Sequence, residues 1–216
     1  MNSAVIVAGG SGSRIGGEIP KQFLKINGDE ILSYSVNTFL KHPKINEVVI
    51  VSHPDWIDTV SKNYPHCQVV KGGNRRQYSS LNGVLATDAK GENVLIHDAA
   101  RPFVTTRIIS DCLEKLIHFE GTAPVMETSN SLIQLENERA IFVDRTKIFE
   151  VQTPQCFKKE FILEVLSNTL EGTDEIGMVL RKYPKAKINF VEGEEKNYKI
   201  TSKMDLQISS QIISNH

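Results

Sequence analysis

Short apolar runs alternate along this chain with longer stretches in which apolar residues recur every three or four positions. The apolar runs are typical of buried β-strands, and they lie at residues 3–8, 46–52, 66–73, 93–100 and 121–126. The longer stretches have the spacing of amphipathic helices, and they lie at residues 31–42, 55–64, 75–88 and 105–119. Such alternation implies right-handed βαβ units. We therefore expect an α/β fold with a Rossmann-like, mostly parallel sheet and helices on both faces.

One segment departs from this alternation. Residues 131–143 contain two apolar runs separated by the polar turn at residues 136–139, which predicts a β-hairpin. We expect a β-arm at about residues 129–151, inserted in a single domain that spans residues 1–216. Because an isolated hairpin is only marginally stable in water, this arm needs a partner surface.

The chain beyond the arm returns to alternating elements. Residues 152–157 are expected to form a loop, followed by helices at 158–170 and 173–182. Strands are expected at 187–193 and 197–201, and a closing helix from Lys203.

Composition excludes several classes of partner. The chain has 25 Lys and Arg against 26 Asp and Glu, a net charge of -1, so no strong field favours nucleic acid or an acidic membrane. No stretch approaches the roughly 20 apolar residues that a membrane-spanning helix needs. Cys67, Cys112 and Cys156 are odd in number and widely spaced, which fits neither a disulfide framework nor a CxxC metal site. We expect a soluble protein of the reducing cytoplasm.

A glycine-rich loop with two cations follows the first strand. The sequence "AGGSGSR" at residues 8–14 can close backbone N–H groups around phosphate oxygens. It fails the dinucleotide fingerprint, because Arg14 occupies the position of the middle glycine, and no lysine follows a glycine as in a P-loop. A nucleoside triphosphate carries about four negative charges and needs cations to hold it. Arg14 and Lys21 favour that ligand over a glycine-rich turn with two solvated cations.

Three further positions are weak candidates when each is taken alone. The glycine pair in "GGNRRQYSS", residues 72–80, can lie against a base or ribose. Asp98 ends a strand, at the edge where open α/β sheets bind their ligands. Taken alone, an Asp at this place is more often a helix cap. Beside a triphosphate loop, it is more often a Mg²⁺ ligand. Lys199 by itself reads as a surface lysine, and His97 as a packed strand histidine.

Together these segments resemble one family. The motifs "AGGSGSR", "PKQFL", "GGNRRQYSS", "HDAARPF", "VDRTKIFEVQTPQCF", "TDE" and "VEGEEKNYKIT" occur in this order between about Ala4 and Leu206. They are similar to those of the cytidylyltransferases that join CTP to a sugar-alcohol phosphate. The resemblance implies Mg²⁺ as cofactor, CTP and a small polyol phosphate as substrates, and a homodimer formed through the β-arm.

The resemblance also implies roles for individual residues. Its catalytic cations correspond to Arg14, Lys21 and Lys199, and its metal ligand to Asp98. Its nucleotide-binding positions correspond to Ala8, Gly9, Gly10, Gly12, Gly73, Arg76, Ser79, Asp98 and Arg101. Its acceptor-binding positions correspond to Thr128, Arg145, Thr153 and Thr173. Arg145 would serve the neighbouring subunit if the arms are exchanged, and its own subunit if the arm folds back.

The implied reaction needs no general base. A phosphate monoester has a second pKa of about 6 and is largely dianionic at neutral pH, so its oxygen can attack the α-phosphorus of CTP directly. Two acceptors stay open, 2-C-methyl-D-erythritol 4-phosphate for isoprenoid synthesis and ribitol 5-phosphate for cell-wall or capsule polymers. A nicotinamide oxidoreductase is disfavoured by the glycine spacing, and a non-catalytic nucleotide sensor by the retained cations.

Overall fold

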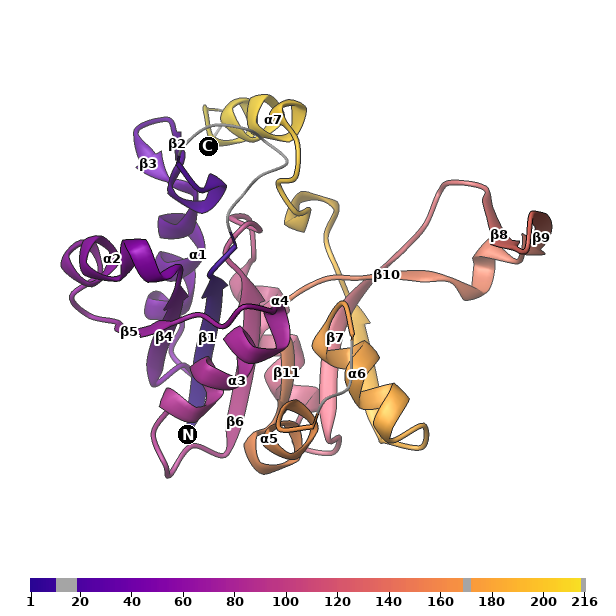
Figure 1. Ribbon diagram of the computed structural model, residues 1–216, viewed down its shortest axis with the longest axis horizontal. Helices are drawn as coiled ribbons and strands as arrows, with labels where there is room; N and C mark the ends of the chain where they lie inside the picture. Colours follow the sequence, from indigo (N-terminus) through magenta and orange to yellow (C-terminus); the bar gives the residue numbers. More distant parts are fainter. Residues whose placement is uncertain (11–18, 169–171, 215–216) are drawn as a thin grey trace.

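The fold is built on one eight-stranded sheet. A computed structural model describes residues 1–10, 19–168 and 172–214 (Figure 1). The strands follow the order β10-β7-β11-β6-β1-β4-β5, with β12 also paired to β7. Their bounds are β1 Asn2–Ala8, β4 Glu47–Ser52, β5 Gln68–Lys71, β6 Asn93–Asp98, β7 Gly121–Glu127, β10 Phe149–Val151, β11 Gln155–Lys158 and β12 Ile188–Glu192.

Most neighbouring strands run parallel. The pairs β1–β4, β1–β6, β4–β5 and β7–β12 are parallel, whereas β10 and β11 pair antiparallel with their neighbours. β11 returns along the sheet and fills the space between β6 and β7. The expected α/β fold with a mostly parallel sheet is therefore confirmed.

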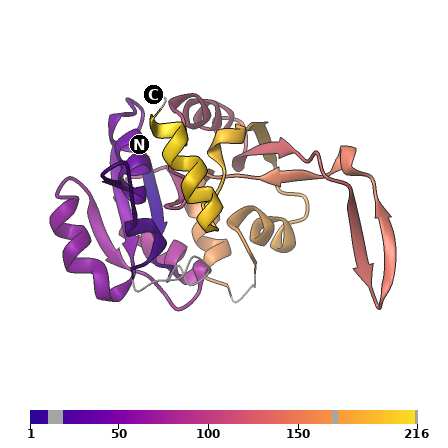
Figure 2. The same ribbon diagram turned by 90° about the horizontal axis from the view of Figure 1, so that it is seen from above.

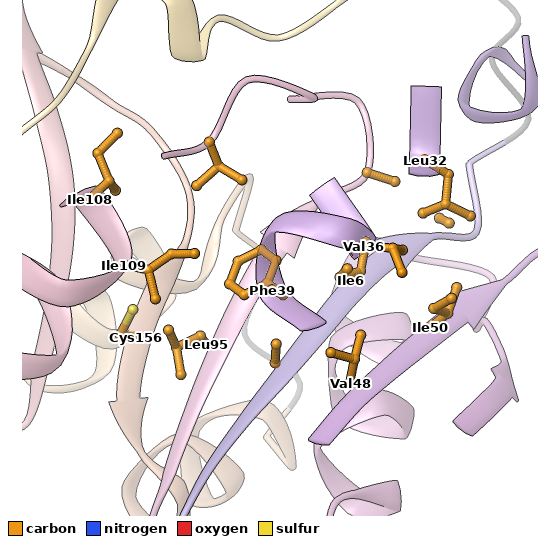
Figure 3. Close-up of a cluster of buried hydrophobic side chains, with 14 of the residues drawn as sticks. Ile6, Leu32, Val36, Phe39, Val48, Ile50, Leu95, Ile108, Ile109 and Cys156 are labelled. Carbon is orange, nitrogen blue, oxygen red and sulfur yellow. The ribbon is translucent and has the colours of Figure 1, made fainter. Parts of the chain in front are cut away.

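Alternation along the central strands divides the core into two layers. In β1, Ala4 and Ile6 belong to one buried cluster and Val5 to the other, because successive side chains of a strand point to opposite faces. β4 repeats the pattern, with Ile50 in the first cluster and Val49 in the second. Figure 3 shows the first cluster, in which Ile6 and Ile50 face helical side chains. Both faces of the sheet are buried, as parallel sheets require.

Helices cover each face of the sheet. α1 and α4 supply the first cluster, and α3, α5 and α6 supply the second. Their bounds are α1 Ile31–Lys41, α2 Ile57–Asn63, α3 Arg76–Ala86, α4 Thr106–Lys115, α5 Lys159–Leu166, α6 Glu175–Lys182 and α7 Lys203–Ser214. A small hairpin of β2, Lys25–Ile26, and β3, Asp29–Glu30, packs with α7 around a third cluster that contains Ile26 and Ile200. The 3-10 turns are η1 Lys21–Phe23, η2 Pro54–Trp56, η3 Arg145–Lys147 and η4 Glu195–Asn197.

Close packing of α3 on the sheet depends on Gly83. A Cβ at this position would lie 2.3 Å from Val5 Cγ1 and 2.6 Å from Val51 Cγ2, two stiff β-branched side chains. Gly83→Ala should therefore destabilise the protein by about 1–3 kcal/mol, although alanine favours a helix by about 1 kcal/mol. Denaturant unfolding measures this loss. Leu85→Ala on the exposed side of α3, where Leu85 is 62% exposed, is the control and should change stability by less than about 0.5 kcal/mol; equal stabilities for the two variants would contradict the packing argument.

The predicted arm forms and projects from the body. β8, Leu132–Glu136, and β9, Arg139–Val143, pair only with each other in the described sheets, and Figures 1 and 2 both show them extending away from the central sheet. Ile133 lies opposite Phe142 in this hairpin, and Phe142 is 84% exposed. The arm therefore does not fold back on its own domain, and its apolar side chains lack cover from the described chain.

Three local expectations are wrong. Residues 152–157 are not simply a loop, because residues 155–158 form β11, where the short apolar stretch pairs with β6 and β7. Residues 197–201 are not a strand; the turn η4 leads into an irregular segment that carries Lys199. The helix expected at 158–170 is shorter, since α5 ends at Leu166. Over the ranges that the structure describes, no helix is long and apolar enough to cross a membrane.

Candidate active site

A cavity of about 720 Å³ opens at the carboxyl ends of β1, β4, β5 and β6. This is the edge at which open α/β sheets bind ligands. Strand register assembles it, since Val7 in β1 pairs with Asp98 in β6 and Ala8 pairs with Ser52 in β4. Predicted residues that line the cavity are Ala8, Gly9, Gly10, Lys21, Gly73, Arg76, Ser79, Asp98 and Lys199. Gly12 and Arg14 lie outside the described residues.

Two glycine segments form the wall next to β1 and β5. A Cβ on Gly73 would lie 2.3 Å from Tyr78 Cβ, so the turn into α3 excludes a side chain there. The Gly73 N–H donates to Ser79 Oγ over 3.1 Å, which fixes the turn. Gln22, which sequence reasoning missed, donates from Nε2 to the carbonyls of Ala8 at 2.6 Å and Gly10 at 2.8 Å. Gln22 thus holds the described start of the glycine loop.

Asp98 is the centre of a cluster of cations. Its Oδ1 accepts from Arg76 Nη1, and its Oδ2 lies 2.8 Å from Lys199 Nζ and 3.7 Å from Arg101 Nε. Burial alone would raise the pKa of Asp98, but Arg76 first, then Lys199 and Arg101, hold that pKa well below its usual range. The carboxylate is therefore ionised at every physiological pH. Arg101 does not line the cavity itself but approaches it through Asp98.

The two catalytic lysines of the resemblance come together from opposite ends of the chain. Lys21, in η1, donates from Nζ to the carbonyl of Ile200 over 2.7 Å, directly beside Lys199. Lys199 in turn pairs with Asp98. The irregular segment around Lys199 is held by Arg101, whose Nη1 donates to the carbonyl of Asn197 over 2.8 Å. Both ammonium groups thus reach one cavity.

His97 is a packed strand histidine, as expected, and it orders the residues around Asp98. Its Nε2 lies 3.0 Å from the carbonyl of Arg101, so that nitrogen carries the proton, and Nδ1 accepts from the Thr153 hydroxyl at 3.0 Å. Burial, the largest effect, lowers the pKa of His97 to about 4, so the ring is neutral. The Thr153 oxygen also accepts from the Asp98 N–H at 3.1 Å. His97 therefore supports Asp98 rather than acting as a base.

The four predicted acceptor residues do not gather in this cavity. Thr153 is buried and its hydroxyl is engaged by His97 and Asp98. Thr128 is buried at the start of the arm, and Arg145, in η3 where the chain returns to the base of the arm, donates to the Ser129 carbonyl. Thr173 lines a second cavity of about 520 Å³ that also includes Arg76. Their acceptor roles stay predictions.

Other residues of the cavity escaped the sequence reasoning. They are Val7, Gln22, His53, Pro54, Lys71, Asn74, Arg75, Ala99 and Ala100. Most of them follow strand ends directly, which is the signal that could have found them. Glu175, which is fully buried and holds Arg76, was also missed.

The donor set fits a Mg²⁺ ion that is held largely by substrate. Asp98 is a carboxylate at the cavity wall, and Mg²⁺ commonly binds through one or two carboxylates plus substrate phosphates and water. In the part of the chain that the structure describes, no three acidic, histidine or cysteine side chains gather as a metal cage. Nε of Arg76 and Nε of Arg101 are buried without a hydrogen-bond partner among the described residues.

Comparison with known proteins decides the family. The sequence model of IspD, 2-C-methyl-D-erythritol 4-phosphate cytidylyltransferase, matches residues 2–215. A 2-C-methyl-D-erythritol 4-phosphate cytidylyltransferase of Thermotoga neapolitana is 35% identical over 97% of this chain and 95% of its own length. The chain belongs to the IspD family. It is therefore a cytidylyltransferase of isoprenoid precursor synthesis, as the sequence motifs predict.

Solved structures support the same assignment. The IspD of Francisella tularensis superimposes with a TM-score of 0.81 at 28% identity, covering 98% of this chain and 99% of that one. A 4-diphosphocytidyl-2C-methyl-D-erythritol synthase from Anaerococcus prevotii has a TM-score of 0.88 at 22% identity, covering 99% and 96% of the two chains, and shows that the fold is shared. The IspD fold thus extends over the whole described chain.

Proposed function

We propose that this chain transfers the cytidylyl group of CTP to 2-C-methyl-D-erythritol 4-phosphate, with Mg²⁺, in a homodimer. One observation carries the proposal: Lys21, Lys199 and Asp98 converge on a glycine-walled cavity at the carboxyl edge of the sheet. Cations and backbone N–H groups at such an edge suit a triphosphate. Family membership supports CTP and a sugar phosphate as the substrates.

The reaction is an in-line displacement at phosphorus. A phosphate oxygen of the acceptor forms a bond to the α-phosphorus of CTP, and the bond from that phosphorus to the bridging oxygen breaks to release pyrophosphate. Lys21 and Lys199 stabilise the negative charge that spreads over the phosphoryl oxygens, a role that the resemblance also assigns to Arg14. The dianionic acceptor phosphate needs no proton transfer, which agrees with the neutral, internally bonded His97.

Asp98 is the residue that would hold Mg²⁺. The ion, when bound, would neutralise part of the triphosphate charge. Asp98 is ionised and buried at the cavity wall, and the His97–Thr153 pair fixes its backbone. Lys199, at 2.8 Å from Oδ2, lines the same cavity and would bind phosphate oxygens of the nucleotide.

A second copy of the chain would complete the acceptor site. Arg145 stands in the projecting arm and does not line the cavity of its own subunit. The exposed apolar face of the arm, which includes Leu135 and Phe142, provides a surface for the partner. Arg145 of the partner subunit would then bind the acceptor phosphate.

CTP, Mg²⁺ and 2-C-methyl-D-erythritol 4-phosphate should give pyrophosphate and the CDP-alcohol in equal amounts. A coupled pyrophosphate assay with product analysis measures both. Ribitol 5-phosphate in place of the acceptor should react at least about tenfold more slowly, the scale of losing well-fitted substrate contacts. Equal rates with ATP or GTP, full activity after chelation of Mg²⁺, or faster reaction with ribitol 5-phosphate would contradict the proposal.

A further inference from the structure

A buried chain of charges runs from the site into the protein. Arg76, in α3, donates from Nη1 to Asp98 and from Nη2 to Glu175 Oε2 over 2.7 Å. Glu175, in α6, is 0% exposed, and its Oε1 accepts from the Ser80 hydroxyl over 2.6 Å. Arg76 and Ser80 are four residues apart and lie on one face of α3. Glu175 thus binds that face of α3 through both of its carboxylate oxygens.

The start of α6 is anchored so that Glu175 has one position. Asp174 caps the helix by accepting from the Gly177 N–H at 2.6 Å, and Gln155 Oε1 accepts from the Ile176 N–H at 2.8 Å. The Glu175 side chain is enclosed between α6 and α3 with Arg76 as its ionic partner. Because the anchored start of α6 fixes Glu175 in place, its carboxylate restrains the guanidinium of Arg76 that it binds.

The charge of Glu175 changes the field at Asp98. Arg76, Lys199 and Arg101 all face the single carboxylate of Asp98, and Glu175 supplies a second negative charge that offsets Arg76. A guanidinium is not deprotonated in proteins. Arg76 is therefore always charged, and Glu175 cancels that charge on the side away from the cavity.

We propose that Glu175 is a positioning residue for divalent-cation binding: it holds and neutralises Arg76, so that Asp98 can accept a metal ion beside a nucleoside triphosphate. The inference rests on the proposed function only for the identity of the nucleotide. The proposal predicts the direction of the change in affinity for a cation and for an anion. Loss of the Glu175 charge adds one positive charge to the site, which weakens a bound cation and does not weaken a bound anion.

The test compares a cation and an anion in the same variant. Glu175→Gln keeps the size of the side chain and removes only its charge. The dissociation constant of Mn²⁺ from the enzyme–CTP complex, measured by electron paramagnetic resonance without acceptor, should rise about tenfold or more. The dissociation constant of CTP in EDTA, measured by equilibrium dialysis, should stay the same or fall. Ser80→Ala, which removes the neighbouring hydrogen bond but no charge, is the matched control and should bind Mn²⁺ within about threefold of wild type.

A second variant keeps the test usable if Glu175→Gln fails to fold. Breaking a buried ion pair can destabilise a protein more than replacing both partners, so Glu175→Gln is also combined with Arg76→Gln. This double variant has no excess positive charge compared with wild type. If Glu175→Gln folds, the Mn²⁺ affinity of the double variant should exceed that of the single variant. If Glu175→Gln does not fold, the Mn²⁺ affinity of the double variant should at least equal that of wild type.

Two results would overturn the role of Glu175. One is unchanged Mn²⁺ affinity in folded Glu175→Gln; the other is parallel weakening of Mn²⁺ and metal-free CTP, which indicates general damage to the site. Neither measurement requires turnover. Absence of cytidylyl transfer by the wild-type enzyme would count against the proposed function and leaves the metal-binding comparison valid.

Discussion

Lys21→Ala is expected to lower kcat by about a hundredfold or more, the scale of losing one preorganised charge contact in a transition state. Lys21 lines the cavity, and its Nζ bonds the Ile200 carbonyl next to Lys199. The substitution therefore removes one cation and loosens the segment that carries the other. Steady-state kinetics with CTP and acceptor varied separately measure kcat and KM. The resemblance predicts a loss of the same size for Arg14→Ala.

Lys25→Ala is the matched control for Lys21. Lys25 lies four residues further on, is exposed, and does not line the cavity. Its replacement should leave kcat within about twofold of wild type, since exposed lysines far from reacting groups contribute little. If Lys21→Ala instead raises the KM for CTP and keeps kcat intact, Lys21 is a binding contact and not a catalytic residue.

Refolding a mixture of Lys21→Ala and Arg145→Ala chains should restore roughly a quarter of wild-type activity. Each variant alone should be nearly inactive. In a two-fold dimer with exchanged arms, about half of all dimers combine the two different chains, and each of these contains one site with both side chains intact. The physical basis is that the arm projects from the body and that Arg145, which follows β9, does not line the cavity of its own subunit. Activity is measured after refolding at equal concentrations.

The composition of the refolded dimers must be known for this test. Tagging one variant and purifying through the tag, followed by sedimentation analysis, gives the fraction of mixed dimers. The parents refolded separately are the controls. If confirmed mixed dimers stay as inactive as their parents, Arg145 acts within its own subunit and the shared acceptor site is wrong. A monomer in sedimentation at assay concentrations would contradict the dimer itself.

The hydrophobic pattern was sufficient to predict β1, β4, β5, β6, β7 and β12 of the central sheet. Val5 and Ile6 alternate between the two cores because side chains of a strand point to opposite faces, and that period is visible in the sequence. The arm was equally visible, since two apolar strands flank a polar turn. The pattern failed at β11, because four residues of mixed character become a strand only when β6 and β7 offer unpaired edges.

Motifs determined part of the site and could not determine its contacts. Ala8 to Gly10 follow the first strand, and Asp98 ends another, so the sequence predicted that both reach the ligand edge of a parallel sheet. Lys21 was predicted as a triphosphate-binding cation from its place after the glycine-rich loop, and Lys199 through family resemblance. The bond from Lys21 to the Ile200 carbonyl joins positions 179 residues apart, and no local period encodes such a contact.

The sequence by itself determined the fold class, the arm, the glycine loop and the reaction type, because each depends on local spacing or on motifs that keep their order along the chain. Only the tertiary structure decided which charges meet. Glu175 is in sequence one more acidic residue at a helix start, yet the fold buries it, and its side chain binds Arg76, which in turn binds Asp98. Ion pairs of this kind are set by the order of strands and the packing of helices, which bring distant residues within hydrogen-bond distance.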